Sequence, residues 1–562
     1  MTRPSSRDSR LRESWSIPRW TALIGAGIEA RNALRIPKLD DEDWWRENTA
    51  RVQVRQLRRL LKKARRTEMG RESGFDRLLK EPDEELVAAF RRAVPIGDWY
   101  AYRDRIARMR EGGEPDVLWP GLVRDFAQTS GTTAGDKFIP VSQDQFRSNF
   151  RASLDIFAHL ARRGIPLARL TAGKCLFLGG STDVVENEHG VRTGDLSGLV
   201  THLIKWPLTE AYLPGPEIAL MDHWPSKIDA MARRCLDEDV RFVSGMASWS
   251  LVLFERVLEM AREQGRKADC VLDIWPNLEV FIHGGVRYDP FRVRVNETVF
   301  GDAEADFPHR LELYPASEGF VAMQDRPHER GLRLMSDLEM FFEFVPLEEI
   351  DADDPPAFTC DAVEKGQRYV VVMTTNAGLW RYILGDVVEF DTVPACLGGV
   401  GGDGPARLRI VGRHRHFINA FGENLIVEHI ETAVAKAATE TGVRIGDFTA
   451  APVYPQSGRR AGLELAVEVV EGREQMDRFA AVFDQALKEQ NVDYTTKRTG
   501  SLGMGEPTVT PLPDGTMSRW LESKGKLGGQ HKFPRCANHR EIIDEVIAAA
   551  GEATVGGGVQ GG

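Results

Sequence analysis

Short apolar runs alternate with helical segments between residues 170 and 425, and this alternation constrains the fold more than any other feature. The apolar, β-rich runs predict buried strands, at residues 175–178, 240–243, 278–282 and 369–373. Residues 225–238 and 248–262 carry apolar side chains at helical spacing and predict helices that cover these strands. The pattern therefore predicts an α/β domain.

The chain contains more than one domain, because 562 residues are too many for a single hydrophobic core. Residues 338–345 alternate partly and predict a barrel or edge strand, and the glycine-rich residues 398–405 predict a surface hairpin. After Arg413 the pattern restarts, and it predicts a strand near 416–425, a helix at 426–441, a strand at 463–470 and a helix at 473–488. We therefore divide the chain into an unassigned arm (1–50), a large domain (51–412), a smaller α+β domain (413–550) and a disordered glycine-rich tail (551–562).

The composition excludes several classes of function. Lys and Arg number 73 and Asp and Glu 84, so the formal net charge of −11 argues against nonspecific nucleic-acid binding. The six cysteines form no Cys-x-x-Cys pair, which predicts neither a zinc site nor a disulfide framework and favours a reducing cytoplasm. The apolar runs are shorter than the roughly 18–20 residues of a membrane helix. Residues 20–28 are apolar but lack a convincing cleavage site, so a signal peptide is not favoured.

Residues 51–66 are strongly basic and have apolar side chains at roughly helical spacing. A basic amphipathic helix of this kind can lie on a membrane surface. A helix that packs on the core with one solvated charged face also has this pattern, and we prefer that interpretation.

Glycines and hydroxyl side chains gather in residues 128–142, ahead of an apolar run. Glycine lets the backbone bend so that successive N–H groups point at one anion, and hydroxyls add further donors. The spacing differs from the Gly-x-x-x-x-Gly-Lys-Ser/Thr loop of common nucleotide-binding proteins. The segment therefore predicts a polyphosphate-binding loop, although a surface turn remains the alternative, and the candidate ligating residues are Thr129, Ser130, Gly131, Thr132, Thr133 and Lys137.

Residues 314–319 close a strand-like run with an aromatic ring and a carboxylate. The ring of Tyr314 can stack on a purine, and Glu318, which follows Ser317, can help to hold a magnesium ion on phosphates. Asp386 follows a glycine, and its ionised carboxylate can accept both hydroxyls of a ribose. A core tyrosine and an ordinary Gly-Asp turn are the structural alternatives at these two places.

Three further candidate motifs lie elsewhere in the chain. Gly284 and Gly285 end an apolar run and allow the backbone to approach a flat base closely. Arg413 stands where the second domain begins. Lys532 lies on a glycine-flanked loop, where a flexible ammonium arm can reach developing charge on a phosphate or carboxylate, or can be a solvated surface lysine.

The order of these motifs is similar to that of the acyl-adenylating superfamily. Four sequence segments also resemble the Gretchen Hagen family of acyl acid amido synthetases. They are residues 342–346, 377–382, 421–425 and 530–535. Plant members of that family conjugate jasmonate, indole-3-acetate or benzoates to amino acids. Residues 56–75 also look like the N-terminal helix and loop of the family, and the resemblance covers most of the chain.

The chain departs from the family pattern in several places. Residues 129–134 read Thr-Ser-Gly-Thr-Thr-Ala where plant members tend to have Ser-Ser-Gly-Thr-Ser-Gly, a mild change because threonine keeps the hydroxyl. Pro315 follows Tyr314 where glycine or alanine is commoner, and His531 replaces a frequent tyrosine. Residues 179–205 look like the acyl-pocket stretch but match least, so the plant acids are not carried over.

The resemblance implies a large adenylating domain, made of α/β subdomains and a β-barrel, followed by a smaller mobile α+β domain. It implies an enzyme that uses ATP and Mg²⁺ to make an acyl-AMP and then transfers the acyl group to an amine. Ser130, Thr132 and Thr133 would grip phosphate, while Tyr314 would pack on adenine, Asp386 would hold the ribose and Glu318 would support Mg²⁺. Lys532 would reach in during adenylation, with Lys137 as the other candidate, and Arg413 would mark the hinge.

The resemblance favours an amino acid as acceptor and a hydrophobic or aromatic carboxylic acid as donor, and leaves the oligomeric state open. Candidate acyl-pocket residues follow strand ends or lie in the weakly matching segment, where open α/β sheets bind ligands. They are Leu178, Ser181, Thr182, Leu199, Val200, Met246, Ser248 and Trp249. A ligase that forms thioesters with coenzyme A and a non-catalytic nucleotide-binding relative remain as alternatives.

Overall fold

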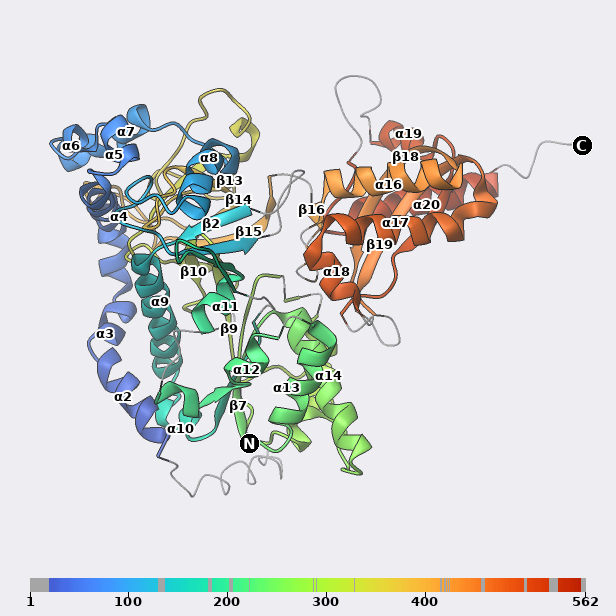
Figure 1. Cartoon of the computed structure of the whole chain (residues 1–562), viewed down its shortest axis with the longest axis horizontal. Coiled ribbons are helices and arrows are strands. Elements are labelled where there is room, and N and C mark those ends of the chain that lie inside the picture. The colour runs from blue at the N-terminus through green and yellow to red at the C-terminus, as the bar shows by residue number, and fades with distance from the viewer. Residues whose placement is uncertain are drawn as a thin grey trace, which may run out of the picture.

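The computed structural model describes residues 20–129, 137–179, 184–201, 206–221, 223–286, 288–289, 291–327, 329–414, 417–418, 421, 423, 425–455, 460–499, 503–524 and 534–556. Figure 1 shows a large N-terminal body and a smaller C-terminal body at the right of the view.

The large body is built on a sheet of eleven strands whose two halves differ. One half is parallel, in the spatial order β9 (His309–Ala316), β8 (Val280–Gly284), β7 (Val240–Ser244), β3 (Lys174–Phe177) and β6 (Tyr212–Leu213). The other half is antiparallel, in the order β12 (Phe341–Pro346), β13 (Arg368–Thr374), β14 (Tyr382–Thr392), β15 (Arg407–Arg413), β11 (Leu332–Leu334) and β10 (Gly319–Met323). The strands expected at residues 175–178, 240–243 and 278–282 are confirmed as β3, β7 and β8.

The strand expected at residues 369–373 is confirmed as a buried strand, and it lies in the antiparallel half of the sheet. It is present as β13 and pairs antiparallel with β12 and β14. After Arg368 the strand is buried throughout, so its continuous apolar run resembles that of a parallel strand. The strand expected at residues 338–345 is confirmed as β12, which lies at the edge of the sheet.

The antiparallel half curls into a barrel. In a flat sheet, β9 and β14 would lie four strand spacings apart, or roughly 19 Å. Instead, the hydroxyl of Tyr314 on β9 donates a hydrogen bond of 2.6 Å to Oδ2 of Asp386 on β14. The interior of the barrel is one hydrophobic cluster with side chains from seven strands, among them Tyr314, Val321, Leu332, Phe342, Tyr369, Val388 and Leu408.

The parallel half is covered by helices on both faces, because successive side chains of a strand point to opposite faces. Val243 and Phe281 pack in the cluster that includes α13 (Trp224–Cys235) and α14 (Ala247–Glu263), which confirms the helices expected there. Their neighbours Phe242 and Val280 pack on the other face with α9 (Gln143–Arg162) and α10 (Leu167–Ala172). Short elements that connect this region are α11 (Leu196–Thr201), η1 (Leu208–Glu210), α12 (Pro216–Ala219), η2 (Val271–Asp273), α15 (Arg292–Phe300) and η3 (Leu347–Glu349).

A second, smaller sheet and a group of N-terminal helices accompany the large sheet. The sheet has the order β2 (Lys137–Val141), β1 (Asp125–Thr129), β5 (Arg192–Gly194) and β4 (Val185–Glu186). The helices are α2 (Ala22–Asn32), α3 (Arg35–Asp40), α4 (Glu42–Ala64), α5 (Glu68–Glu72), α6 (Phe75–Leu78), α7 (Asp83–Ala93) and α8 (Trp99–Glu111).

Helix α4 contains all but the last two residues of the basic segment 51–66, and its apolar side chains are buried in the core. Val54, Leu57 and Leu60 pack in the cluster that contains Phe75 and Trp119. The preferred interpretation, a core-packed helix with a solvated basic face, is therefore confirmed. Within the described ranges, the structure contains no helix with the length and apolar character needed to cross a bilayer.

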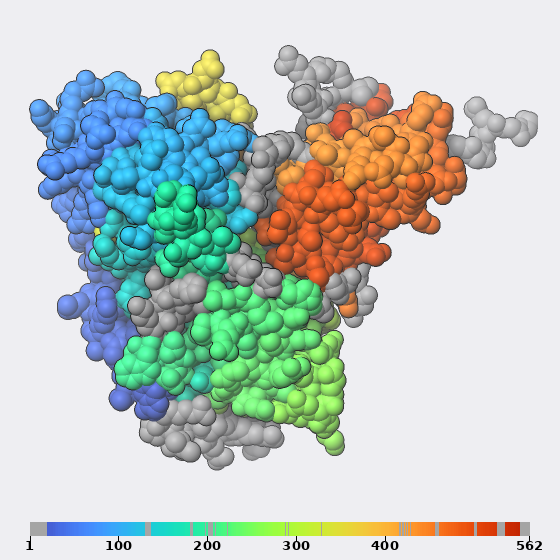
Figure 2. Space-filling view, viewed as in Figure 1, coloured from blue at the N-terminus to red at the C-terminus, as the bar shows by residue number. Residues whose placement is uncertain are grey.

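The C-terminal body is an α+β unit with its own sheet. The hairpin of β16 (Phe417–Ile418) and β17 (Leu425–Ile426) leads into it, and its sheet has the order β18 (Arg444–Val453), β19 (Gly462–Glu471) and β20 (Thr508–Pro513). Its helices are α16 (Val427–Thr441), η4 (Arg473–Gln475), α17 (Met476–Gln490), α18 (Val492–Arg498), α19 (Thr516–Ser523) and α20 (Glu541–Gly556). The elements expected at 426–441, 463–470 and 473–488 are present, whereas α20 extends into the first six residues of the tail expected to be disordered. In Figure 2 the C-terminal body, in orange, meets the large body beside the green surface that includes α13 and α14.

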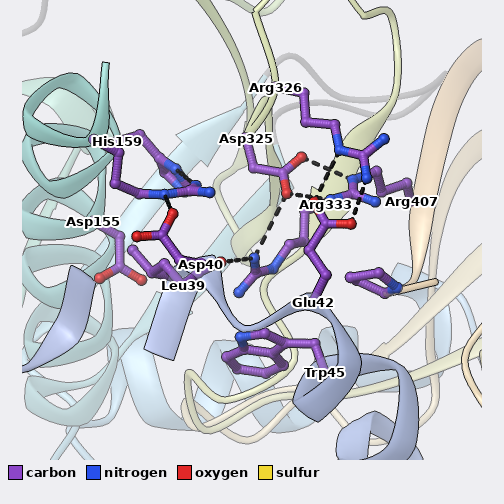
Figure 3. Close-up of polar contacts among 12 residues, drawn as sticks. Leu39, Asp40, Glu42, Trp45, Asp155, His159, Asp325, Arg326, Arg333 and Arg407 are labelled. Atoms are coloured by element: carbon purple, nitrogen blue, oxygen red, sulfur yellow. Dashed lines mark hydrogen bonds and ion pairs between the residues drawn. The ribbon is translucent and has the colours of Figure 1, made fainter. Parts of the chain in front are cut away.

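Buried ion pairs attach the start of α4 to the barrel (Figure 3). Arg407 on β15 donates to Asp325 at 2.7 Å and to Glu42 at 2.9 Å, and Glu42 also pairs with Arg326. Arg333 donates to the carbonyl of Leu39 at 2.9 Å. Because Arg407, Asp325 and Arg333 are shielded from water, each of these charges depends on its partners for stabilisation.

Replacing Arg407 should therefore destabilise the large domain. The Arg407 side chain is 2% exposed, so Arg407→Met would leave the buried carboxylate of Asp325 poorly compensated, at a cost of about 3–5 kcal/mol. Arg409 on the same strand is 39% exposed and pairs with Asp391, so Arg409→Met should cost about 0–1 kcal/mol. Chemical denaturation of both variants tests this difference, and equal losses of stability would contradict it.

Candidate functional site

Asp386 is bonded to two other candidate nucleotide residues of the barrel, Tyr314 and Arg413. Its Oδ2 accepts the hydroxyl of Tyr314 at 2.6 Å, and its Oδ1 accepts Nε of Arg413 at 2.6 Å. Asp386 and Arg413 face each other in the register of β14 and β15. An ionised carboxylate has about four acceptor positions, so the two bonds leave capacity for ribose hydroxyls.

The backbone at Gly385 helps to form this part of the barrel. Gly385 has φ of +94°, a conformation that favours glycine, and its carbonyl accepts the backbone N–H of His414 at 3.0 Å. This backbone hydrogen bond connects the residue before Asp386 with the residue after Arg413.

Glu318 lies in the turn between β9 and β10 and faces the same charges. Burial raises its pKa, while the positive charges of Arg413 and Lys137 act in the opposite direction. The hydroxyl of Tyr382 is hydrogen-bonded to Glu318, and burial raises the pKa of that tyrosine. Gln145 on α9 donates to the carbonyl of Ser317 at 2.7 Å and so holds the turn in place.

The residues around Glu318 fit a magnesium ion that is held mainly by substrate. Mg²⁺ commonly takes one or two carboxylates together with the phosphates of a nucleotide. Glu318 has the negative charge of Asp386 nearby, which raises its pKa and which a cation would offset. Among the described residues, His, Cys, Asp and Glu side chains form no group of three that could hold a metal alone.

The predicted phosphate loop spans the turn between two antiparallel strands. Thr129 at the end of β1 lies opposite Lys137 at the start of β2 in the strand register. Ser130, Gly131, Thr132 and Thr133 lie outside the described residues. Lys137 also acts on the pKa of Glu318, so the start of β2 and the β9–β10 turn are neighbours.

Gly284 and Gly285 lie at the carboxyl end of β8, where the sheet approaches other backbone closely. A Cβ atom on Gly284 would lie 2.4 Å from the carbonyl oxygen of Leu313 on β9. Gly285 has φ of +80°, and a Cβ atom there would lie 3.0 Å from Sδ of Met246. These two glycines, which are candidate nucleotide residues, therefore lie next to Met246, which is a candidate acyl-pocket residue.

The structure brings together only some of the candidate acyl residues. Leu178 and Trp249 pack in one hydrophobic cluster, with Met246 against it. Ser248 is fully buried in the first turn of α14, and its hydroxyl has no hydrogen-bond partner within the described part of the chain. Leu199 packs elsewhere, in the cluster of α4 and the small sheet, because α11 contacts β1. Ser181, Thr182 and the side chain of Val200 lie outside the described structure, as does Lys532.

Sequence reasoning missed a buried ion pair that supports this site. Arg381 donates to Glu343 at 2.9 Å and to the carbonyl of Val94 at 2.8 Å, and it has φ of +47°. The next residue is Tyr382, the hydrogen-bond partner of Glu318. Glu343 and Arg381 belong to two of the motifs that carried the resemblance. Each is a charged residue within an apolar run, and this was the signal in the sequence that could have indicated a buried ion pair.

Comparison with known families accounts for most of the chain. The GH3 family N-terminal domain matches residues 44–217, the GH3 family central domain matches residues 333–395, and the GH3 family C-terminal domain matches residues 428–541. The chain therefore belongs to the GH3 family.

The relatives are distant in sequence. The chain is 22% identical to the indole-3-acetic acid-amido synthetase GH3.3 of Arabidopsis thaliana, over 49% of this chain and 46% of that protein. It is 22% identical to the probable indole-3-acetic acid-amido synthetase GH3.1 of the same plant, over 81% of this chain and 84% of that protein. The chain thus matches about half the length of the first and most of the second.

A solved structure supports the fold. The chain is similar to AtGH3.15 acyl acid amido synthetase in complex with 2,4-DB, with a TM-score of 0.55 and 17% identity, over 95% of this chain and 97% of that one. The likeness extends over both bodies, and it confirms the predicted combination of a large α/β domain with a smaller C-terminal domain.

The charges around Glu318 predict a pH effect. Because burial raises the pKa of Glu318, this carboxyl takes up its proton at a higher pH than an exposed glutamate and loses its cation-binding form as the pH falls. Lys137 opposes the rise, so Lys137→Met should raise the pKa further and move the acid limb of Mg²⁺-dependent ATP binding to higher pH. Calorimetry between about pH 5 and pH 8 tests this displacement.

The matched control is Lys365→Met, which removes an exposed lysine that pairs with Asp403. This variant should leave the acid limb in place. An equal displacement in both variants would show that Lys137 has no specific effect on Glu318.

Proposed function

We propose that this chain is an ATP-dependent acyl acid amido synthetase. The observation that carries the proposal is the convergence of Tyr314, Glu318, Asp386 and Arg413 beside the start of β2, in a member of the GH3 family. In the first half-reaction a carboxylate oxygen attacks the α-phosphorus of ATP, and pyrophosphate leaves. In the second, an amine nitrogen attacks the acyl carbon and loses a proton, and AMP leaves.

The charge distribution of the site supports the first half-reaction. Adenylation concentrates negative charge on the phosphates, which fixed donors and cations stabilise in the transition state. Arg413 and Lys137 supply positive charge near Glu318, and Glu318 would supply a carboxylate for Mg²⁺. Asp386 would accept the ribose hydroxyls. Because Tyr314 is only 4% exposed, its contribution would be to hold Asp386 as well as to contact adenine.

The names of the relatives favour an amide product. They include amido synthetases and the 4-substituted benzoates-glutamate ligase GH3.12 of Arabidopsis thaliana, which is 25% identical over 47% of this chain and 46% of that protein. We therefore propose an amino acid as acceptor and a hydrophobic or aromatic acid as donor, with Leu178, Met246 and Trp249 around the acyl group. A ligase that forms a thioester with coenzyme A is the second candidate.

Arg413 is the proposed boundary between the two moving parts. It ends β15, the last strand of the large sheet before the small hairpin of β16 and β17. Its bond to Asp386 holds Arg413 on the large domain. The C-terminal domain would therefore turn about the residues that follow Arg413.

The products of the reaction test the proposed chemistry. The chain, ATP and Mg²⁺ incubated with a panel of carboxylic acids should release AMP and pyrophosphate, and added amino acids should yield amides detectable by mass spectrometry. Release of ADP and phosphate would contradict adenylation. Capture of the adenylate by coenzyme A and by no amine would establish the thioester ligase instead.

The role of Lys532 is tested by substitution. Lys532→Ala should slow acyl-AMP formation by about 10²–10³-fold, the usual effect of losing one donor to developing charge, while ATP binding persists. Lys524→Ala is a matched control, since Lys524 ends α19 and pairs with Glu545 at 2.9 Å. An unchanged adenylation rate in Lys532→Ala would make Lys137 the residue to test next.

A further inference from the structure

A lysine of the C-terminal domain lies on two tryptophan rings of the large domain. Nζ of Lys497, on α18, is 4.1 Å from the ring centroid of Trp249 and 5.4 Å from that of Trp224. The two indoles are 4.8 Å apart and come from the first turns of α14 and α13. Lys497 is 3% exposed, so water does not weaken the attraction between the ammonium group and the rings.

Trp249 contacts the C-terminal domain a second time. Its Nε1 donates to the carbonyl of Phe421 at 3.1 Å, in the segment between β16 and β17. Phe421 also packs against Phe291 of the large domain, with ring centroids 5.8 Å apart. One ring of the candidate acyl pocket therefore has its edge and its face held by the domain that carries Lys532.

The docked arrangement also brings two positive charges together. Lys227 on α13 is 1% exposed and donates to the carbonyl of Ala219 at 2.7 Å and to that of Gly179 at 3.3 Å. The pKa of Lys227 is lowered to about 8, mainly by burial and also by the charge of Lys497, while the charge of Asp195 acts in the opposite direction. Burial also lowers the pKa of Lys497, and the negative charge of Asp195 opposes this change as it does for Lys227.

These contacts oppose one another in free energy. The attraction of Lys497 to the indoles and to Asp195 favours docking, whereas desolvation of Lys497 and repulsion from Lys227 disfavour it. Because favourable and unfavourable contributions offset each other, the C-terminal domain can leave this docked orientation for another one. A domain that serves two half-reactions requires such a change.

We propose that Lys497 is a positioning residue whose seat on Trp249 and Trp224 sets how long the C-terminal domain stays docked on the acyl pocket, and thereby divides the enzyme between its two half-reactions. The inference rests on the proposed function, because it assumes that adenylation and amide formation use different orientations of the C-terminal domain. Lys497 acts through Trp249 and needs no contact with the reacting atoms.

The test separates the two half-reactions in the full chain. Lys497→Met keeps the length of the side chain and removes the charge, and Lys497→Arg keeps a cation for the rings. Acyl-AMP formation is measured by rapid quench without amine, and amide formation is measured by adding amine to the preformed acyl-AMP complex. Lys436→Met, which removes an exposed lysine of α16 that pairs with Glu489, is the matched control.

In Lys497→Met the two rate constants should change in opposite directions, and their ratio should change by about 3- to 30-fold, the range for a single cation–π contact. Lys497→Arg should restore most of the ratio, and Lys436→Met should leave it unchanged. An equal fall in both rates, an unchanged ratio or a lack of rescue by arginine would overturn the proposal.

A second measurement tests the docking contact without catalysis. Because the charge of Lys497 lowers the pKa of Lys227, the pKa of Lys227 should rise in Lys497→Met, as followed by carbon-13 NMR of the lysine Cε. An unchanged pKa would overturn the contact on which the inference depends. If the wild-type chain makes no acyl-AMP from any acid, the proposed function fails, and the Lys227 titration still decides whether Lys497 docks here.

Discussion

The carboxylate of Asp386 is the interaction on which the rest of the site depends. It binds Tyr314 and Arg413 at once, and these residues come from strands on opposite sides of a curled sheet. The bond to Tyr314 exists only because the antiparallel half closes into a barrel. A site assembled in this way is as rigid as the barrel itself, which suits the proposed role of Asp386 in accepting ribose hydroxyls.

Buried charge supports this arrangement at two further places. Arg381 and Glu343 link β14 to β12 beside the site, and Arg407 and Asp325 link β15 to the loop after β10. Buried ion pairs add little net stability but are costly to break, so they enforce one register more than they strengthen the fold. In this chain both pairs hold the barrel strands β14 and β15, which carry Tyr382, Asp386 and Arg413.

The two bodies meet through a small number of directed contacts. Trp249 receives the ammonium of Lys497 on its face and donates its N–H to Phe421, while Phe291 packs against the ring of Phe421. The first turns of α13 and α14 thus have two roles, one toward the candidate acyl pocket and one toward the C-terminal domain. Such a junction allows the state of the pocket to influence where the domain lies.

The sequence by itself determined the local elements, because hydrophobic period and turn chemistry act over a few residues. It predicted β3, β7, β8 and α14 and the restart of the pattern after Arg413. It also offered Tyr314, Glu318 and Asp386 as candidate nucleotide residues, through motif order and resemblance to a family.

Only the tertiary structure decided which of these elements are neighbours. An apolar run reports that a strand is buried but not which strand lies beside it, so the sequence predicted β13 as a buried strand and left its antiparallel neighbours β12 and β14 open. Leu199 was grouped with Trp249, yet α11 contacts β1 and carries it into another core. The contact of Lys497 with Trp249 joins residues of two domains, and no period or motif could indicate it, because it depends on how two separately folded surfaces meet.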